Sequence, residues 1–531
     1  MSADLTGLPE RLAAAPDRTI RLVGLDGRLH TRTFAELRDD VAALTGELRE
    51  RGVAEGDFVG VLGPNCYDWI VVDLALLGMG CVSVALAVQG RPEPEELAEL
   101  VERYRLTALL VVGRAVPSSE GLPPAAALLE ERPLRFTPRE WGPGDRPELP
   151  ADVFTVAFSS GTSGSRKGLM LTRSGVMNTI TTSREAWEVT GDDDILIVMP
   201  FSNFQQRYLM YLAIVSGCSA TVVAPERMFQ QLKKLEPTIV LGPPSFYEIV
   251  ANRVDAAEGK EKLPYQVAAL LHAALPEGLT RSLRARLGHR WTGMYGSRVR
   301  LMFTGSAPVP PHVVRLFQQL GAPLFEVYGS TEVGWIAFNL PGRHRTGTAG
   351  RPVAGIEVTL ADDGEVVVRS PHPQAAGYVF DGVETRPSVF LPDGSITGGD
   401  LGVFEKGGFL RLAGRKKNVI ITRSGVKINP EELELELEKS SPATRVLVAS
   451  PAGDGLLTCV AWLEDGDSPE LAAGVEAAVA EFNRTRDAAH RIAEVVLRPN
   501  KELTVENGLL TRNFKLDRTA VMREVFAEVA R

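Results

Sequence analysis

The sequence predicts an α/β protein made of a large N-terminal domain and a small C-terminal domain. A chain of 531 residues is longer than one hydrophobic core usually supports, so two or more domains are expected. β-branched runs alternate with helical patterns as far as Gly334, which is typical of α/β subdomains. From Gly347 to Gly402 short strand patterns follow one another with Asp-Gly and Gly-Gly turns, which indicates a small β-barrel-like part.

The first α/β unit precedes a proline-rich segment at residues 116–150. Residues 18–24 (RTIRLVG) and 57–63 (DFVGVLG) are predicted strands. Between them a helix is predicted to begin near Thr33 and to end at Gly52. Its buried face is expected to consist of Leu37, Val41, Leu44 and Leu48.

The longest apolar run, residues 69–88, is interrupted by Asp73 and by glycine and serine. This pattern predicts a buried helix followed by a strand rather than a membrane span. The N-terminal segment contains acidic residues and no long apolar core, so no signal peptide is expected. We therefore expect a cytoplasmic protein.

Composition excludes several functional classes. The net charge of -9 argues against a nucleic-acid partner and against an anionic membrane partner. The seven histidines lack metal-ligand spacing. The four cysteines lack paired spacing, so neither a disulfide framework nor a zinc site is expected. These cysteines are Cys66, Cys81, Cys218 and Cys459.

The domain boundary is predicted between Arg415 and Lys417, where the β-rich part ends. The remaining segment of about 115 residues has the size of a small domain. Its first helix has Asn429 as a candidate cap and Pro430 at its first position. We therefore predict domains at residues 1–414 and 415–531.

Residues 159–168 (SSGTSGSRKG) are rich in glycine and hydroxyl groups and contain Arg166 and Lys167. They suit either a flexible basic linker or a cradle in which backbone N–H groups and cations hold phosphate oxygens. A predicted strand, 152–158, precedes them, and a helix capped by Thr172 or Ser174 is expected to follow, which favours the cradle. The spacing differs from that of a Walker loop, so an ordinary P-loop NTPase is disfavoured.

Four segments in one order make the chain resemble the adenylate-forming superfamily, which includes acyl-CoA synthetases, adenylation domains and luciferases. They are residues 158–172, 327–334, 413–434 and 505–518. The last of these, and MPFSNFQQRYL at 199–209, look closest to medium- and long-chain acyl-CoA synthetases. The resemblance implies that the C-terminal domain is a mobile α+β domain that rotates about a hinge at Lys417.

The reaction implied by the resemblance is that of an AMP-forming acid–thiol ligase. A carboxylate attacks the α-phosphate of ATP to give an acyl-adenylate and pyrophosphate, and the thiol of CoA then displaces AMP. ATP, Mg²⁺ and CoA are the implied cofactors and acceptor. Two anions must approach each other, so cations and backbone amides must offset their repulsion.

The resemblance also implies site residues for the nucleotide and the metal. Glu332 would hold Mg²⁺, Asp400 would accept from both ribose hydroxyls, and Arg415 would lie near ribose and phosphate. Lys515 would bridge the substrate carboxylate and the α-phosphate, which Thr331 contacts. The phosphate loop would use Ser159, Gly161, Thr162, Ser163, Gly164 and Lys167, and the adenine would lie against Gly305, Ser306, Ala307, Tyr328 and Gly329.

Two further sets follow from the same resemblance. Gly425 and Lys427 would line the thiol tunnel for CoA or a carrier-protein phosphopantetheine. The acid, expected to have a mainly apolar body with some polar decoration, would lie in a pocket with aromatic and amide residues. That set comprises Phe201, Asn203, Phe204, Gln205, Arg207, Phe246 and residues 329–335 up to Trp335.

Three positions depart from the family pattern. Arg166 replaces the usual proline, Asn203 replaces a histidine that is common in acyl-CoA synthetases, and Gly398 replaces a threonine before the ribose aspartate. These departures motivate the first of three alternatives to the full ligase. One is an enzyme that makes the thioester only from a supplied acyl-adenylate; a second transfers the acyl group to a carrier protein or an amine; a third is a non-catalytic adenylate-binding protein.

Overall fold

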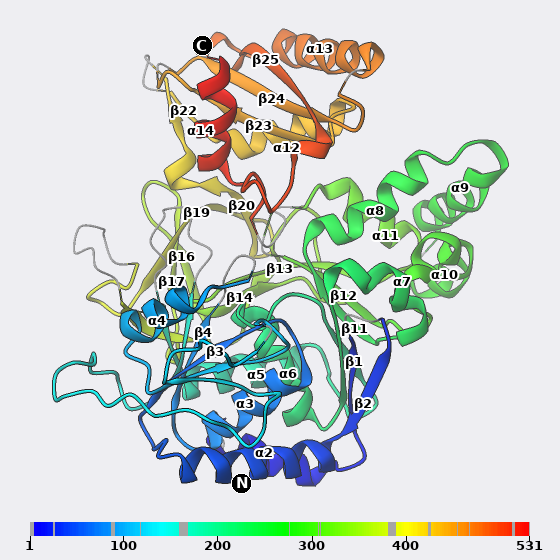
Figure 1. Ribbon diagram of the computed structural model, residues 1–531. Coiled ribbons are helices and arrows are strands. Elements are labelled where there is room, and N and C mark those ends of the chain that lie inside the picture. The colour runs from blue at the N-terminus through cyan, green and yellow to red at the C-terminus, as the bar shows by residue number, and fades with distance from the viewer. Residues whose placement is uncertain are drawn as a thin grey trace.

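A computed structural model of the protein describes residues 5–24, 27–86, 91–116, 118–158, 168–275, 277–305, 307, 309–380, 389–422, 426–453, 455–466, 468–511 and 516–529. Within these residues the strands form sheets of nine, seven, four, three and two strands. The predicted mixed α/β fold class is confirmed. The elements before Arg415 form the large body in Figure 1, and the later elements sit above it.

The largest sheet has the strand order β15-β14-β13-β12-β11-β9-β10-β1-β2. The six central strands, from β13 through β12, β11, β9 and β10 to β1, run parallel. Strand β2 pairs antiparallel with β1 at one edge, and β14 and β15 extend the other side with antiparallel pairing. The strands are β1 (Thr19–Val23), β2 (Leu29–Thr33), β9 (Asp194–Ile197), β10 (Ser219–Val223), β11 (Ile239–Gly242), β12 (Leu301–Thr304), β13 (Leu324–Ser330), β14 (Gly334–Phe338) and β15 (Arg351–Pro352).

The second sheet has the order β18-β8-β7-β4-β3-β5-β6, in which β8 and β18 are antiparallel additions to a parallel sheet. Its strands are β3 (Phe58–Leu62), β4 (Val82–Leu86), β5 (Ala108–Val111), β6 (Ala126–Leu128), β7 (Val153–Phe158), β8 (Gly168–Thr172) and β18 (Ala375–Val379). Both sheets contribute to one hydrophobic core, which also contains residues of helices α2 (Phe34–Glu50), α3 (Tyr67–Gly78), α5 (Arg173–Ala186) and α6 (Phe204–Ser216).

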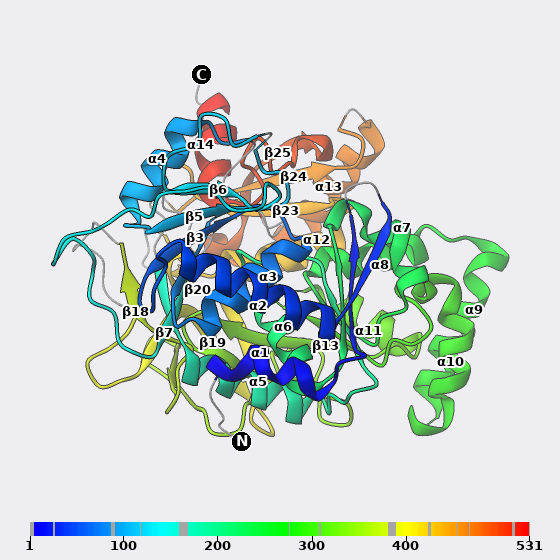
Figure 2. The same cartoon turned by 60° about the horizontal axis from the view of Figure 1, so that its bottom comes forward.

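The helices of this body follow the sequence pattern closely. Helix α2 begins with a capping box between Thr33 and Glu36, and all four apolar residues predicted for its inner face are buried. Figure 2 shows α2 beside α3, the buried helix predicted within residues 69–88. The helices are α1 (Leu8–Arg11), α2 (Phe34–Glu50), α3 (Tyr67–Gly78), α4 (Pro94–Arg103), α5 (Arg173–Ala186), α6 (Phe204–Ser216), α7 (Pro225–Leu235), α8 (Pro244–Asp255), α9 (Gly259–Ala274), α10 (Glu277–Thr292) and α11 (Pro311–Gln319).

The short strands expected after Gly347 form a four-stranded antiparallel sheet, which continues to Arg415. They are β16 (Glu357–Leu360), β17 (Glu365–Arg369), β19 (Ile396–Glu405) and β20 (Phe409–Arg415). Because β19 and β20 are hydrogen-bonded neighbours, Asp400 and Arg415 lie opposite each other in register. This register places two predicted site residues side by side.

The C-terminal elements surround a three-stranded sheet with its own two hydrophobic clusters. Asn429 occupies the N-cap position of α12, although its side chain makes no capping hydrogen bond, and Pro430 is the first helical residue. The elements are β21 (Ile420–Ile421), β22 (Lys427–Ile428), α12 (Pro430–Ser440), β23 (Arg445–Ala449), β24 (Leu457–Leu463), α13 (Pro469–Arg484), β25 (Ile492–Pro499) and α14 (Arg518–Val529). Among the described residues, no helix has both the length and the apolar character needed to cross a membrane.

Candidate active site

Three residues predicted for the nucleotide meet where β13, β19 and β20 come together. Tyr328 Oη donates to Asp400 Oδ2 at 2.7 Å, and Arg415 Nε lies 2.6 Å from Asp400 Oδ1. Arg415 also donates from Nη1 to the carbonyl oxygen of Gly398 at 3.2 Å. Burial, followed by the neighbouring Asp400 charge, raises the pKa of the Tyr328 phenol well above its usual value, so the phenol stays a hydrogen-bond donor.

Gly398, one of the three departures from the family pattern, lies inside this cluster. A Cβ atom added at this glycine would be 3.5 Å from Asp400 Oδ2 and 3.9 Å from Tyr328 Oη. Both distances are ordinary van der Waals contacts, so there is room for a Cβ atom at this position, next to the Asp400 carboxylate. The structure therefore places the position that lacks the hydroxyl beside the predicted ribose-binding residue.

Thr331 and Glu332 lie in the turn between β13 and β14, held by two residues that the sequence did not suggest. Gln374 donates from Nε2 to the carbonyl oxygen of Thr331 at 3.2 Å, and Tyr378 Oη donates to Glu332 Oε1 at 3.0 Å. Gln374 is itself oriented by Thr179, which donates from Oγ1 at 3.1 Å. Gln374 and Tyr378 lie in the PHPQAAGY segment, which carries no motif that single-sequence reasoning recognises.

The residues around Glu332 suit a magnesium ion that is bound mainly by the phosphates of a substrate. Among the described residues no group of three or more His, Cys, Asp and Glu side chains is arranged to hold a metal. Glu332, half-buried in the turn after β13, can therefore offer a metal ion a single carboxylate. Mg²⁺ is often bound by one or two carboxylates together with substrate phosphates, so Glu332 suits an ion shared with ATP.

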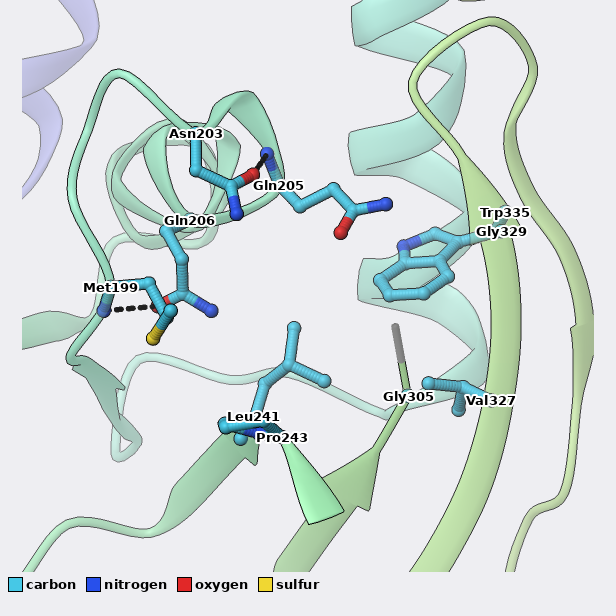
Figure 3. A pocket seen from close by; sticks show the side chains of 11 residues that line it. Met199, Asn203, Gln205, Gln206, Leu241, Pro243, Gly305, Val327, Gly329 and Trp335 are labelled. Carbon is cyan, nitrogen blue, oxygen red and sulfur yellow. Dashed lines mark hydrogen bonds between the residues drawn. The ribbon is translucent and has the colours of Figure 1, made fainter. Parts of the chain in front are cut away.

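A small cavity of about 30 Å³ lies beside these residues, between α6 and the ends of β11, β12 and β13 (Figure 3). Trp335 forms one wall, and its Nε1 donates to Ser183 Oγ at 3.0 Å and to Tyr208 Oη at 3.1 Å. Asn203 lies opposite as the N-cap of α6, where its Oδ1 accepts from the backbone N–H of Gln205 at 3.1 Å. The lining residues are Met199, Asn203, Gln205, Gln206, Leu241, Gly242, Pro243, Gly305, Val327, Gly329 and Trp335.

The glycine at position 329 permits close packing at the cavity wall. A Cβ at Gly329 would lie 2.5 Å from the Gly334 carbonyl oxygen and 2.9 Å from the Trp335 ring. A larger residue would therefore displace the indole that forms the wall.

Outside the 329–335 segment, four residues predicted for the acyl pocket are not among those that line this cavity. Phe201, Phe204 and Phe246 are buried in hydrophobic clusters. Arg207 is fully buried and forms an ion pair with Asp73 of α3, donating from Nε to Oδ2 at 2.9 Å. A buried guanidinium needs a partner for its charge, and that partner is 134 residues away in the sequence.

The strands on either side of the predicted phosphate loop correct one local prediction. Strand β7 ends at Phe158 and pairs antiparallel with β8, which begins at Gly168, so the segment joins two strands instead of a strand and a helix. Helix α5 follows β8, and Thr172, the first of its two candidate caps, accepts from the N–H of Gly175. Leu169 and Leu171 are buried, which explains why the chain remains extended here before the helix.

Several predicted residues lie outside the described part of the chain. They are Ser159, Gly161, Thr162, Ser163, Gly164, Arg166, Lys167, Ser306, Gly425 and Lys515. Three other predicted residues lie within the described part. Ala307 is half-buried near Gly305, Lys417 is exposed just after β20, and Lys427 is exposed on β22.

A family model described as AMP-binding enzyme matches residues 8–379, well over half of the chain. The chain belongs to the AMP-binding enzyme family. The resemblance to adenylate-forming enzymes is thereby confirmed at the level of the family.

Curated relatives of this AMP-binding enzyme match along most of their length. The long-chain-fatty-acid–CoA ligase FadD15 of Mycobacterium bovis is 26% identical, with 97% of this chain and 94% of the relative covered. The peroxisomal long chain acyl-CoA synthetase 6 of Arabidopsis thaliana is 27% identical, with 96% and 82% covered.

Solved structures share the fold of this AMP-binding enzyme. The anthranilate CoA ligase AuaEII, in complex with anthranoyl-AMP, superposes with a TM-score of 0.75 at 18% identity and covers 100% of both chains. The amide bond synthetase McbA from Marinactinospora thermotolerans gives a TM-score of 0.72 at 22% identity, with 98% and 99% covered. At these identities the likeness concerns the fold.

Proposed function

We propose that this AMP-binding enzyme is an acyl-CoA synthetase that converts a carboxylic acid, ATP and CoA into acyl-CoA, AMP and pyrophosphate. One observation carries the proposal. The β13 strand and the turn after it serve two neighbouring places: Val327 and Gly329 line the cavity, whereas Tyr328 between them binds Asp400. Successive strand residues point to opposite faces, so one strand can hold the acid on one side and the nucleotide on the other.

The first step joins the two substrates. A carboxylate oxygen attacks the α-phosphorus of ATP, the bond to the bridging oxygen breaks, and pyrophosphate leaves. Thr331, in the turn after β13, is the proposed contact of the α-phosphate, and Asp400 and Arg415 position the ribose. The loop residues from Ser159 to Lys167 and Lys515 are proposed to offset the charge of the phosphates and the carboxylate.

Mg²⁺, when bound with ATP, would neutralise phosphate charge as the pyrophosphate departs. Glu332 is the proposed protein ligand, and Tyr378 orients its carboxylate.

The second step transfers the acyl group to sulfur. The CoA thiol loses its proton to solvent, the thiolate attacks the acyl carbon, and the bond from that carbon to the adenylate oxygen breaks to release AMP. Gly425 and Lys427 are the proposed lining of the thiol path, and a rotation near Lys417 is the proposed change between the two steps.

The acid is proposed to have a mainly apolar body. The cavity wall combines Trp335, Leu241 and Met199 with the amide side chains of Asn203, Gln205 and Gln206. Such a lining suits an apolar acid that carries a small polar group. The names of the two curated relatives add support for fatty acids as members of this class.

The test measures pyrophosphate release and thioester formation with ATP, Mg²⁺ and a panel of fatty and aromatic acids, with and without CoA. We expect pyrophosphate with at least one acid and acyl-CoA only when CoA is present. A Lys515→Ala variant should lose pyrophosphate release but still form acyl-CoA from a synthetic acyl-adenylate. The same losses in both assays would contradict the role proposed for Lys515.

Asn203 and Gly398 favour one alternative, an enzyme that performs only the second step. Asn203 cannot titrate, and its Oδ1 caps α6, whereas Gly398 leaves Asp400 without a neighbouring hydroxyl from this position. An enzyme limited to the second step would form acyl-CoA from the synthetic acyl-adenylate but release no pyrophosphate with any acid. If the protein binds ATP but releases no pyrophosphate with any acid, the adenylation step of the proposal is overturned.

A further inference from the structure

Helices α9 and α10 form an antiparallel hairpin at the edge of the molecule. Figures 1 and 2 both show it projecting on the same side, away from the sheets. Its inner face is anchored to α11: Tyr265 Oη donates to Gln319 Oε1 at 2.8 Å, and the buried Arg284 donates to the carbonyl oxygen of Gln318. The Tyr265 and Trp291 rings meet edge to face within the hairpin. The orientation of the hairpin on the body is therefore well defined.

The outward face of the hairpin is unusually apolar. On α9 the exposed residues Leu263, Val267 and Leu270 follow at intervals of four and three, which places them in one stripe. On α10 the exposed Leu279 and Leu283 are four residues apart. Leu279 is 78% exposed and Leu270 is 68% exposed. Large apolar side chains exposed in a stripe along α9, with two more on the paired helix α10, mark an interaction site.

The charge of the hairpin has the opposite sign to that of the whole chain. Residues 259–292 contain six Lys and Arg against two Glu, whereas the chain carries a net charge of -9. Lys260, Arg281 and Arg286 are exposed, and Arg286 follows Leu279 by seven residues and Leu283 by three, which places it on their side of α10. Arg290 pairs with Glu261 at 2.9 Å, which links the two helices at the end away from the tip.

We infer that the α9–α10 hairpin docks onto an anionic lipid surface. The leucines of the outward face enter the boundary between head groups and acyl chains, and the neighbouring cations bind head-group phosphates. The average charge of the sequence argued against such a partner. Electrostatic attraction to a membrane acts over about 10 Å, however, so the local charge of the hairpin decides.

The position of the hairpin connects this surface to the candidate active site. The hairpin belongs to the connection between β11 and β12, and Gly242 and Gly305 at the ends of these strands line the cavity. Docking therefore holds the cavity-bearing body at the lipid surface. The inference does not rest on the proposed reaction, because vesicle binding is measured without substrates.

The experiment is flotation of the full chain with vesicles of phosphatidylcholine alone or of equal parts phosphatidylcholine and phosphatidylglycerol. We expect binding to the anionic vesicles and not to the neutral ones. The triple variant Leu270→Ser, Leu279→Ser, Leu283→Ser and the double variant Arg281→Glu, Arg286→Glu should each bind at least about tenfold more weakly. These side chains are exposed, so both variants should fold, which unchanged thermal unfolding verifies.

Leu456→Ser is the matched control, because Leu456 is 62% exposed but belongs to the C-terminal domain. It should bind as the unchanged protein does. The inference is overturned if the unchanged protein binds neither vesicle or if the hairpin variants bind as well as the control. It is equally overturned if sedimentation without lipid shows a dimer that the leucine variant abolishes and vesicles fail to bind, because the face would then bind a second copy.

Discussion

At the scale of single residues, Gly398 offers the most direct test of the nucleotide end of the site. A Cβ atom there would lie 3.5 Å from Asp400 Oδ2 without a steric clash, so we expect the hydroxyl of a threonine to come within reach of that carboxylate. We expect Gly398→Thr to lower KM for ATP about three- to tenfold, the effect of one added hydrogen bond. Gly398→Val, which has the same shape without the hydroxyl, is the control. Equal KM values for the two variants would show that the hydroxyl does not act on ATP.

Glu326, two residues before Tyr328 on β13, predicts how stability depends on pH. Burial raises the pKa of its carboxyl from 4.5 to about 8, although the N–H of Gly347 donates to it. The folded protein therefore holds a proton that the unfolded chain loses, so the contribution of this group to stability decreases as pH rises between these values. Below the lower value the two states bind the proton equally.

The corresponding variant is Glu326→Gln, which removes this titration. Between about pH 5 and about pH 8 we expect the free energy of unfolding of the unchanged protein to fall relative to that of the variant by about 3–4 kcal/mol. Chemical denaturation at several pH values measures the difference. Glu506→Gln is the control, because Glu506 is exposed. Its free energy of unfolding should change with pH as that of the unchanged protein does. If the free energy of unfolding of Glu326→Gln also changed with pH as that of the unchanged protein does, Glu326 would not be the source of this pH dependence.

At the scale of the elements, the Arg207–Asp73 ion pair joins α6 to α3 in the core shared by the two large sheets. Arg207 also donates to Tyr211 Oη at 2.9 Å, to Thr155 Oγ1 at 2.7 Å and to Ser83 Oγ at 2.9 Å. The first turn of α6 carries Gln205 and Gln206 of the cavity wall. The network therefore fixes the helix that forms one side of the cavity.

Replacing Asp73 with Asn leaves the guanidinium charge buried without its counter-ion. We expect a loss of about 3–5 kcal/mol in the free energy of unfolding and a higher KM for the acid, because α6 shifts. Glu481→Gln breaks the exposed pair with Arg484 and should change neither quantity measurably. A destabilised Asp73→Asn enzyme with an unchanged KM for the acid would separate the ion pair from the cavity.

At the scale of the whole molecule, an ion pair among the described residues connects the C-terminal elements to the body at a place remote in sequence from the predicted hinge near Lys417. Arg445 of β23 lies 2.6 Å from Glu248 of α8, and both side chains are largely buried. Breaking this pair should free the C-terminal elements to move about the segment near Lys417. We expect Glu248→Gln to be cleaved by trypsin near residues 415–417 several times faster than the unchanged protein.

The control for this experiment is Glu261→Gln, whose ion pair with Arg290 stays within the α9–α10 hairpin. It should be cleaved near residues 415–417 at the rate of the unchanged protein. Equal rates for Glu248→Gln and the control would show that the Arg445–Glu248 pair does not hold the C-terminal elements in place.

Local patterns account for the elements that were predicted well. Helix α2 follows from the Thr33 cap and its apolar spacing, and the strands predicted at residues 18–24 and 57–63 appear as β1 and β3. The segment after the phosphate loop was predicted less well, because β8 forms only by pairing with β7 and β18. Strand pairing between distant segments overrides local propensity.

Taken alone, the sequence predicted the mixed α/β class and the family, which are confirmed, and it proposed the residues of the candidate site, because all of these depend on short motifs and their order. The folded chain decided which of those residues meet. It brought Tyr328, Asp400 and Arg415 together, but it used Arg207 for an ion pair with Asp73 instead of the cavity. It also gathered cations and leucines on one hairpin of an acidic protein. Such partnerships join residues far apart in the chain, and only the packing of sheets and helices sets those distances.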